Sequence, residues 1–490
     1  MPTPRLTLAT LAELLDYVSV SAGMAVAASS YMVLGLLVRA HSLAELVLVM
    51  GAACAMCLLL ALALGEMSSR FPSAPGIRTY VRRAFGERIS LFFTYVLMFI
   101  IPLVAGVEIK VFLAALLPDA SVALQCLVAA LLVLLLAWLN LSGHDLPRTA
   151  QTLVFCLLVL VSLYFSALGL SGAPSASALP QLAAASASAS AATSPGSTLA
   201  AIGEGIGLAF FLFVGFEWVA PMARSPKAAK GVVPWSMVWA VALLGLMYLA
   251  FGLALKLSLP AALLASSSVP HVTLGEHLLG GPGRWLAQAL SLFALLTTLN
   301  AGLMGATRLV YGLARERALG PQCSAWLAHL SEQGVPSRVV QVLASASLLV
   351  ALWVIAGDHA TAVASAGAGL YTLIYGVFAA SHVRLRQQGA ARPDFHTRVP
   401  NWVYHLLALL ALAVATATLL AAVQDSALAL LALLAFALVA ALMAHHVAKG
   451  RSTSTASTPF NPTAATTATA HTPHPRHAPA PSPTRADNLP

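Results

Sequence analysis

The sequence predicts an all-α integral membrane protein with about twelve transmembrane helices. Of its 490 residues, 59% are hydrophobic and only 9% are charged, whereas about a quarter of the residues of a soluble globular protein carry a charge. The apolar residues form continuous runs, and about 20 residues of α-helix cross the roughly 30 Å hydrocarbon core of a bilayer. Because the runs lack the alternation typical of a membrane β-barrel, they predict helices.

The predicted spans divide the chain into three parts. Residues 1–14 form a cytoplasmic N-terminus, 15–444 the transmembrane domain and 449–490 a disordered cytoplasmic tail rich in Thr, Pro, Ala and His. Within the membrane domain, 171–198 is a low-complexity external loop of mostly Ala and Ser, a composition that buries too little apolar area to fold. The spans, in chain order, are 15–37, 46–65, 90–117, 122–141, 149–170, 200–219, 233–255, 285–309, 339–356, 362–380, 402–423 and 428–444.

Positive charges predict the orientation, because Lys and Arg near span ends stay on the cytoplasmic side. With the N-terminus inside, most of the 26 Lys and Arg residues fall in cytoplasmic segments, and an even number of spans places the C-terminus inside too. The sequence therefore predicts a plasma (inner) membrane protein with both termini cytoplasmic and the lipid bilayer as a partner. The net charge of +9 follows from this topology, so no nucleic-acid partner is expected.

The first span contains a run of small residues with hydroxyl groups at mid-membrane depth. One interpretation is close helix packing, in which small residues let two backbones approach. The other is a local opening of the helix at a binding site, and the run alone favours neither. The residues concerned are Gly23, Ala27, Ala28 and Ser29.

The sixth span combines glycine with a carboxylate. Gly215 and Glu217 lie within the run FVGFE; a glycine weakens a helix by about 0.8–1 kcal/mol relative to alanine, and a charge at the bilayer centre is costly unless paired or hydrated. Both features predict that this helix opens near Gly215. Freed N–H groups and a half-helix N-terminus then hold a carboxylate, while freed carbonyls hold an ammonium group or a cation. An amino acid carries both charges.

Three motifs occur in order along the chain. Residues 65–76 read GEMSSRFPSAPG, residues 213–217 read FVGFE and precede Pro226 and Lys227, and residues 298–301 read TLNA before GATR. The first is similar to the second-span exit of amino acid–polyamine–organocation permeases, the second is similar to their sixth span and following loop, and the third also matches. The resemblance covers roughly residues 15–444.

The resemblance implies a leucine-transporter-like inverted repeat, with spans one to five mirrored by spans six to ten and helices 1 and 6 broken. It also implies secondary active transport by alternating access. The family's first-span break falls on Ala27-Ala28-Ser29, where Ala and Ser in place of glycine add Cβ atoms at the point of closest approach to a ligand. In the sixth span, Phe211 matches the aromatic that gates or stacks on substrate. The implied substrate-binding residues are Gly23, Ala27, Ala28, Ser29, Glu108, Phe211, Phe213, Gly215 and Phe216.

Four further residues are candidates for proton or cation handling. Glu108, in the third span, is a candidate for contacting a substrate amine or carrying a proton. Glu217 is predicted to have a gating or proton-responsive role, the alternative being a structural carboxylate at a span end. Thr297 and Thr298 are candidate sodium ligands beside the first-span break, although Thr in a span more often bonds its own helix backbone.

No catalytic residue, metal site or cofactor is predicted, and the expected partner is a small-molecule substrate. Some relatives place a lysine in the fifth span where others bind sodium, but this fifth span has no lysine, so the coupling ion stays open between sodium and the expected proton coupling or exchange. The dispersed intramembrane charges disfavour a channel, and the absence of a nucleophile–base cluster disfavours an enzyme. The alternatives are an amine, polyamine or ethanolamine-type permease, and a non-transporting solute sensor on the same fold.

Overall fold

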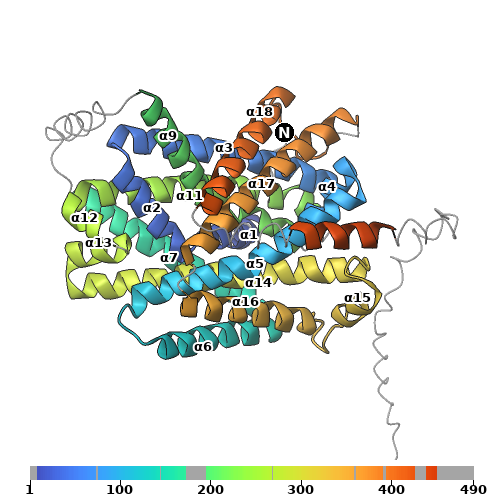
Figure 1. Cartoon of the computed structure of the whole chain (residues 1–490), viewed down its shortest axis with the longest axis horizontal. Helices are drawn as coiled ribbons and strands as arrows, with labels where there is room; N and C mark the ends of the chain where they lie inside the picture. The colour runs from blue at the N-terminus through green and yellow to red at the C-terminus, as the bar shows by residue number, and fades with distance from the viewer. Residues whose placement is uncertain are drawn as a thin grey trace, which may run out of the picture. The chain divides into compact units, whose positions relative to one another are not determined.

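Every regular element that the computed structural model describes is a helix (Figure 1). It describes residues 8–72, 76–143, 145–172, 195–223, 225–267, 269–357, 360–389, 393–424 and 437–449. Helices suit a bilayer because each backbone N–H and C=O is bonded within its own segment. The elements are α1 Leu8–Ala25, α2 Ala28–Ala40, α3 Leu43–Arg70, α4 Gly76–Phe85, α5 Glu87–Leu116, α6 Val122–Leu141, α7 Asp145–Ser171, α9 Pro195–Phe211, the 3-10 helix η1 Phe216–Met222, α10 Pro226–Lys230, α11 Val232–Ser258, α12 Ala261–Ser266, α13 Pro270–Leu279, α14 Gly281–Arg315, α15 Pro321–Leu327, α16 Ser337–Gly357, α17 Ala360–Gln387 and α18 Asn401–Gln424.

Ten spans are long and apolar enough to cross a membrane in the described part of the chain. Nine are continuous apolar stretches, one of which, Ile202–Met222, contains the end of α9 and all of η1, and the pair α1 and α2, bent by 61° at a short break, forms the tenth. The predicted eleventh and twelfth spans correspond to the shorter apolar helices Asn401–Ala417 and Ala437–Lys449. The first half of the predicted twelfth span lies outside the described residues, as do most of the predicted external loop and of the predicted tail.

The ten spans form two successive groups of five with the same plan, which confirms the predicted inverted repeat. The first group is α1/α2, α3, α5, α6 and α7, and the second is α9/η1, α11, α14, α16 and α17. Each group begins with a broken span, and short helices follow its second span: α4 in the first group, α12 and α13 in the second. The broken helices are therefore one and six.

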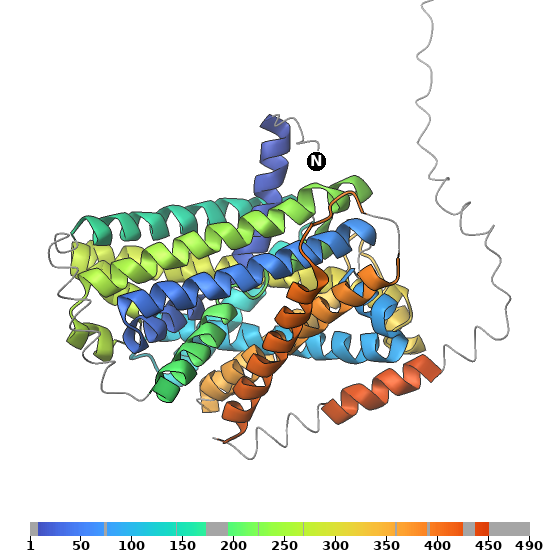
Figure 2. The same ribbon diagram turned by 90° about the horizontal axis from the view of Figure 1, so that it is seen from above.

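The break regions lie inside the bundle. Helix α1 packs against α7, α11, α14 and η1, so the first half of span one touches the second half of span six. Figure 2 shows α11 running alongside α3 and α7, where it covers this central region. This packing positions the site described below.

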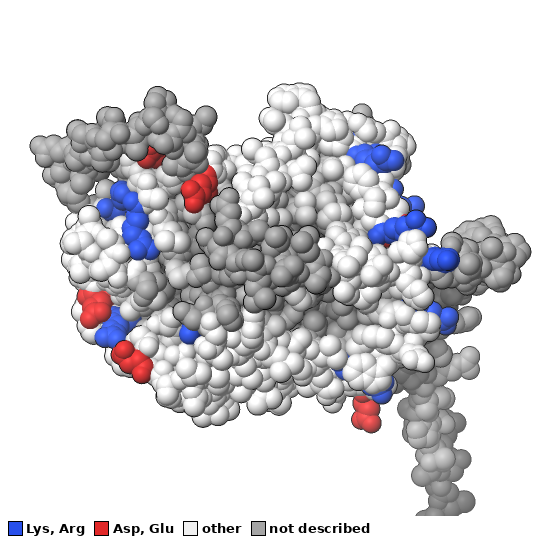
Figure 3. Space-filling view, viewed as in Figure 1, with Lys and Arg blue, Asp and Glu red and all other residues white. Residues whose placement is uncertain are grey.

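The surface of the bundle matches a membrane environment. On the face drawn in Figure 3, charged side chains lie mainly toward the two ends, and the described surface between them is almost uncharged. Large apolar side chains such as Leu134, Leu160 and Leu349 are exposed. These side chains would face lipid in a membrane.

Helix boundaries differ from the predicted spans where capping, rather than hydropathy, decides the end. Helix α3 begins at a capping box in which the Ser42 hydroxyl accepts from Glu45 N and the Glu45 carboxylate accepts from Ser42 N at 2.8 Å, an arrangement that satisfies two of the free donors of a first turn. Helix α9 begins at Pro195, inside the predicted external loop. The predicted sixth span, 200–219, consists of the two helices α9 and η1, as its predicted opening near Gly215 implies.

Candidate functional site

Span one is interrupted at Val26 and Ala27. Helix α1 ends at Ala25, and α2 begins at Ala28 after Ala27 takes an extended conformation with φ −95° and ψ 162°. The predicted break at Ala27-Ala28-Ser29 is therefore placed slightly too late, because Ala28 and Ser29 already belong to the first turn of α2. An alanine side chain has no oxygen with which to cap the N–H groups of that turn.

Glu108 caps the N-terminus of α2 from a neighbouring span. The Ser29 backbone N–H donates to Glu108 Oε2 at 3.0 Å, and the Ser29 hydroxyl donates to Glu108 Oε1. Glu108 lies on α5 and its residue is 1% exposed. Because the N-terminus of a helix carries a partial positive charge, a carboxylate is the group it attracts most strongly. The structure thus joins two predicted site residues, Ser29 and Glu108.

Span six is interrupted between Phe211 and Phe216, where a glycine is required. Gly215 has φ 117°, a left-handed conformation that residues with a Cβ rarely adopt,. A Cβ built on Gly215 would lie 2.8 Å from Met24 Cγ and 3.2 Å from the Met24 backbone. The break in span six therefore lies directly against the end of α1.

Glu217 follows this break and is held by an aromatic hydroxyl from α17. Tyr375 donates to Glu217 Oε2 at 2.5 Å and accepts from Gly215 N at 3.0 Å, so one hydroxyl bridges the break and the carboxylate. Glu217 is buried, and its Oε1 atom has no hydrogen-bond partner among the described residues. One turn earlier on α17, the Tyr371 hydroxyl accepts from the Trp218 indole at 2.6 Å.

The two interrupted spans are joined by a direct hydrogen bond. The Ser21 hydroxyl of α1 donates to Phe216 O at 2.7 Å. Of the three predicted aromatic residues, Phe216 is fully buried with its ring 5.8 Å from that of Tyr375, and Phe213 is fully buried against Tyr248. Phe211, the predicted gate, is only partly buried at the end of α9.

The two predicted cation ligands have different partners. Thr298 donates to Val26 O at 2.9 Å and lies 3.3 Å from Gly23 O, so its hydroxyl meets the carbonyls freed at the first break. The Thr297 hydroxyl instead bonds carbonyls of its own helix, including Ala294 O at 3.0 Å, as is common for Thr inside helices. Gly23 is packed tightly, since a Cβ there would lie 2.3 Å from Gln151 Nε2.

A small cavity lies beside the first break. It has a volume of about 50 Å³ and is bounded by α1, α5, α6, α14 and α16, which is room for a few water molecules. Its lining is mostly apolar, with Met24, Ile109 and Leu299 on three of these helices, and Thr298 and Ser347 add hydroxyl groups.

The outer ends of the two halves of span one are fixed to different neighbours. In α1, Asp16 forms an ion pair with Arg148 of α7. At the far end of α2, the ammonium group of Lys256, from α11, donates to Val38 O and to the following His41 O, both at 2.8 Å. Carbonyls at a helix C-terminus attract such a cation.

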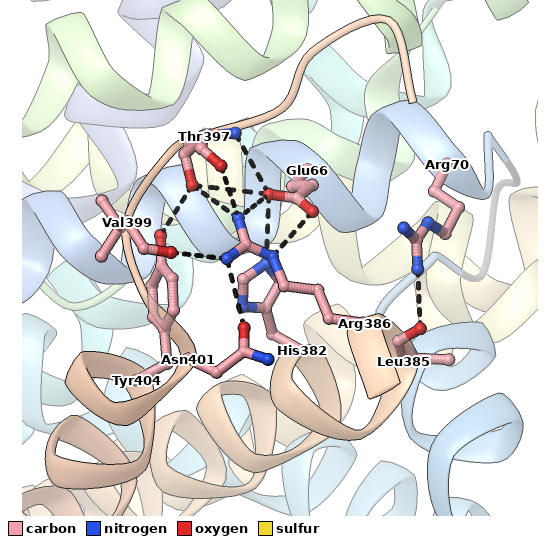
Figure 4. A network of polar contacts seen from close by, with 9 residues as sticks. All are labelled: Glu66, Arg70, His382, Leu385, Arg386, Thr397, Val399, Asn401 and Tyr404. Atoms are coloured by element: carbon pink, nitrogen blue, oxygen red, sulfur yellow. Dashed lines mark hydrogen bonds and ion pairs between the residues drawn. The ribbon is translucent and has the colours of Figure 1, made fainter. Parts of the chain in front are cut away.

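A second polar network joins α3, α17 and the segment before α18 (Figure 4). Arg386 donates from Nε to Glu66 Oε1 at 2.9 Å and from Nη2 to Glu66 Oε2 at 2.5 Å, a bidentate pair,. Its Nη1 donates to Val399 O at 2.6 Å. His382 Nε2 lies 3.4 Å from the same carboxylate, and Glu66 is buried. The network therefore fixes the end of α3 to α17.

The structure brings most of the predicted site residues together and adds partners that the sequence analysis missed. Tyr375, Tyr371 and Tyr248 were missed, although Tyr in an apolar span needs a partner for its hydroxyl and so gives a usable signal. Tyr371 and Tyr375 are also spaced to share one helix face. Among the described residues, no group of three or more His, Cys, Asp or Glu could hold a metal ion.

Sequence comparison finds permeases. Residues 9–454 match the family described as amino acid permease. A Bacillus subtilis (strain 168) protein, the uncharacterized amino acid permease YecA, is 26% identical over 266 residues. That match spans 50% of this chain and 55% of YecA, so about half the length of each.

Structural comparison finds transporters of the same fold at low sequence identity. A Na⁺-coupled sialic acid symporter in a substrate-bound outward-open state has a TM-score of 0.54 and 15% identity, with 83% of this chain and 88% of the symporter covered. The Eremococcus coleocola manganese transporter, bound to an aromatic bis-isothiourea compound, has a TM-score of 0.56 and 16% identity, with 91% and 96% covered. The family match spans nearly the whole chain, and this protein belongs to the amino acid permease family.

Proposed function

We propose that this protein is a secondary active transporter that moves amino acids or related amines across the plasma membrane by alternating access. The observation that carries the proposal is the contact between two interrupted spans, where Ser21 of α1 bonds Phe216 O beyond the second break. Backbone groups freed at two such breaks can hold a small charged solute near the bilayer midplane. Membership of the permease family and the shared fold support the proposal.

We further propose that transport is coupled to protons or proceeds by exchange. Glu108 and Glu217 are buried, and the ion pairs found in the described residues involve neither of them. A carboxylate inside the membrane without a basic partner is the type of group that carries protons in pumps and transporters. The arrangement of basic residues supports cytoplasmic N- and C-termini.

Uptake by proteoliposomes tests this function. We expect labelled amino acid or amine to accumulate when an inward proton gradient is imposed, or when unlabelled solute is present inside, and not when only a sodium gradient is imposed. Empty liposomes are the control. Sodium-driven accumulation would contradict proton coupling, and tight binding without any uptake would identify a sensor instead of a transporter.

Replacing Thr298 by valine tests the cation alternative. Valine has nearly the same shape but leaves Val26 O and Gly23 O without the hydroxyl, and an unsatisfied buried polar group costs about 1–3 kcal/mol,. We expect a lower thermal midpoint in detergent and reduced uptake at every sodium concentration, with Thr298→Ser close to wild type. A variant that changed only the sodium concentration for half-maximal uptake would show instead that this hydroxyl binds the ion.

A further inference from the structure

At the first break, the N-terminus of α2 could attract the carboxylate of a solute, but a carboxylate of the protein itself already occupies this position. Helix α2 is 13 residues long, and the N–H of Ser29 in its first turn already bonds Glu108, as does the Ser29 hydroxyl. In a carrier with a free half-helix N-terminus at this place, these donors would hold the carboxylate of an amino acid. Here that carboxylate comes from α5.

A solute carboxylate would compete with Glu108 for the same donors. If it bound beside Glu108, two like charges would lie together in a buried site, which is strongly unfavourable. The side chains of Ala27 and Ala28 also occupy the space next to the backbone at this break, and both residues are buried. Geometry and charge therefore both disfavour a second carboxylate at this break.

Neither of the two buried carboxylates near the breaks, Glu108 and Glu217, belongs to an ion pair in the described part of the chain. Glu217 is a second buried carboxylate, and its Oε1 atom has no partner in the described part of the chain. Lys110 is two positions from Glu108 on α5, so it lies on nearly the opposite helix face. His271, on α13, packs with its ring 5.1 Å from that of Tyr31 on α2, and it is neutral because burial lowers its pKa to about 3,.

We propose that the transported solute is an amine that lacks a carboxylate, and that Glu108 is the residue that neutralises its ammonium group. This inference rests on the proposed transport function and assigns the substrate class of the same site. Glu108 keeps the negative charge that an amino acid would otherwise bring to α2, so the solute needs to supply only the positive one. Carbonyl oxygens freed at the breaks provide further acceptors for an ammonium group.

Matched pairs of compounds that differ by one carboxylate test the substrate class on the wild-type protein. The pairs are 1,5-diaminopentane with lysine, 1,4-diaminobutane with ornithine, and 2-aminoethanol with serine. Thermal shift in detergent and uptake in proteoliposomes are measured for all six. We expect one or more of the amines to bind at least about 10-fold more tightly than its amino acid partner, because a buried like-charge pair costs more than one pKa unit of interaction. We expect the same amine to be taken up in preference to that amino acid.

Replacing Glu108 by glutamine tests whether the charge of this side chain binds the amine. Glutamine keeps an oxygen that can accept from Ser29 N but removes the charge, so we expect amine affinity to fall at least about 10-fold while the amino acid partner loses nothing. Asp119→Asn is the matched control, since it removes one negative charge from an exposed position just after α5. If Glu108→Gln fails to fold, the paired comparison on the wild type still decides.

The outcomes separate this inference from the proposed function. Preferred uptake of the amino acid in every pair, or unchanged amine affinity in a folded Glu108→Gln protein, would overturn the inference and leave the transporter proposal standing. Binding and uptake of none of the six compounds by a correctly folded protein would overturn both.

Discussion

Replacing Gly215 by leucine is expected to abolish uptake while leaving membrane insertion intact. The φ of 117° strains any residue with a Cβ, at a cost of order 1–3 kcal/mol,. The new Cβ would also lie 2.8 Å from Met24 Cγ and 3.2 Å from Met24 backbone atoms, which cannot yield as a flexible side chain can. The two breaks would be pushed apart, and we expect uptake to fall at least about 10-fold on the strain alone.

The matched control is Gly203→Leu in the same span. A Cβ on Gly203 meets no atom within 4 Å, and the residue is exposed, so this variant adds the same side chain without a clash. Uptake is measured in proteoliposomes at equal amounts of reconstituted protein, with membrane insertion checked by resistance to alkaline extraction and folding by size-exclusion chromatography. Normal uptake by the Gly215→Leu protein would count against a substrate site at this break.

Replacing Arg386 by methionine is expected to give the largest loss of stability. The guanidinium is the bidentate partner of the buried Glu66 carboxylate and also bonds Thr397 and Val399 carbonyls (Figure 4). Removing one member of a buried ion pair leaves the other charge uncompensated, which costs about 3–5 kcal/mol. We expect a clearly lower midpoint in thermal unfolding monitored by size-exclusion chromatography.

A double substitution shows whether the loss comes from the uncompensated charge. Glu66→Gln combined with Arg386→Met removes both charges, and we expect it to recover part of the stability lost in the single variant. Arg384→Met, at an exposed position two residues away on α17, should have little effect. If the double variant lost as much stability as the two single variants lose together, the charge pair would not be the source of the loss.

Local features of the sequence are enough to predict the second break, but they do not predict which side chains contact it. Gly215 and Glu217 lie two residues apart in an apolar run, so a destabilised helix can be recognised without knowledge of its neighbours. The first break was placed slightly late because Val26 to Ser29 are all small or apolar and no residue in the run dictates where the helix must stop. Hydropathy detects apolar length, whereas the end of a helix depends on its backbone partners.

Contacts between segments that are distant in the sequence could not be predicted from the sequence alone. Ser29 and Glu108 were both candidates, but they are 79 positions apart and nothing in either segment indicates that one caps the other. Arg386 meets Glu66 across 320 positions, and Tyr375 meets Glu217 across 158. Such pairings are set by how helices pack, so they follow from the fold and not from local pattern.

The separate attachment of the two halves of span one has a mechanical consequence. The Asp16–Arg148 ion pair ties α1 to α7, whereas Lys256 ties the far end of α2 to α11. Only Val26 and Ala27 connect the halves, and both are held by hydrogen bonds, Val26 O to the Thr298 hydroxyl and Ala27 N to Ser30 Oγ. Because α11 packs against both α1 and α2, a change in the angle between the two halves would require these hydrogen bonds to break and both halves to shift against α11.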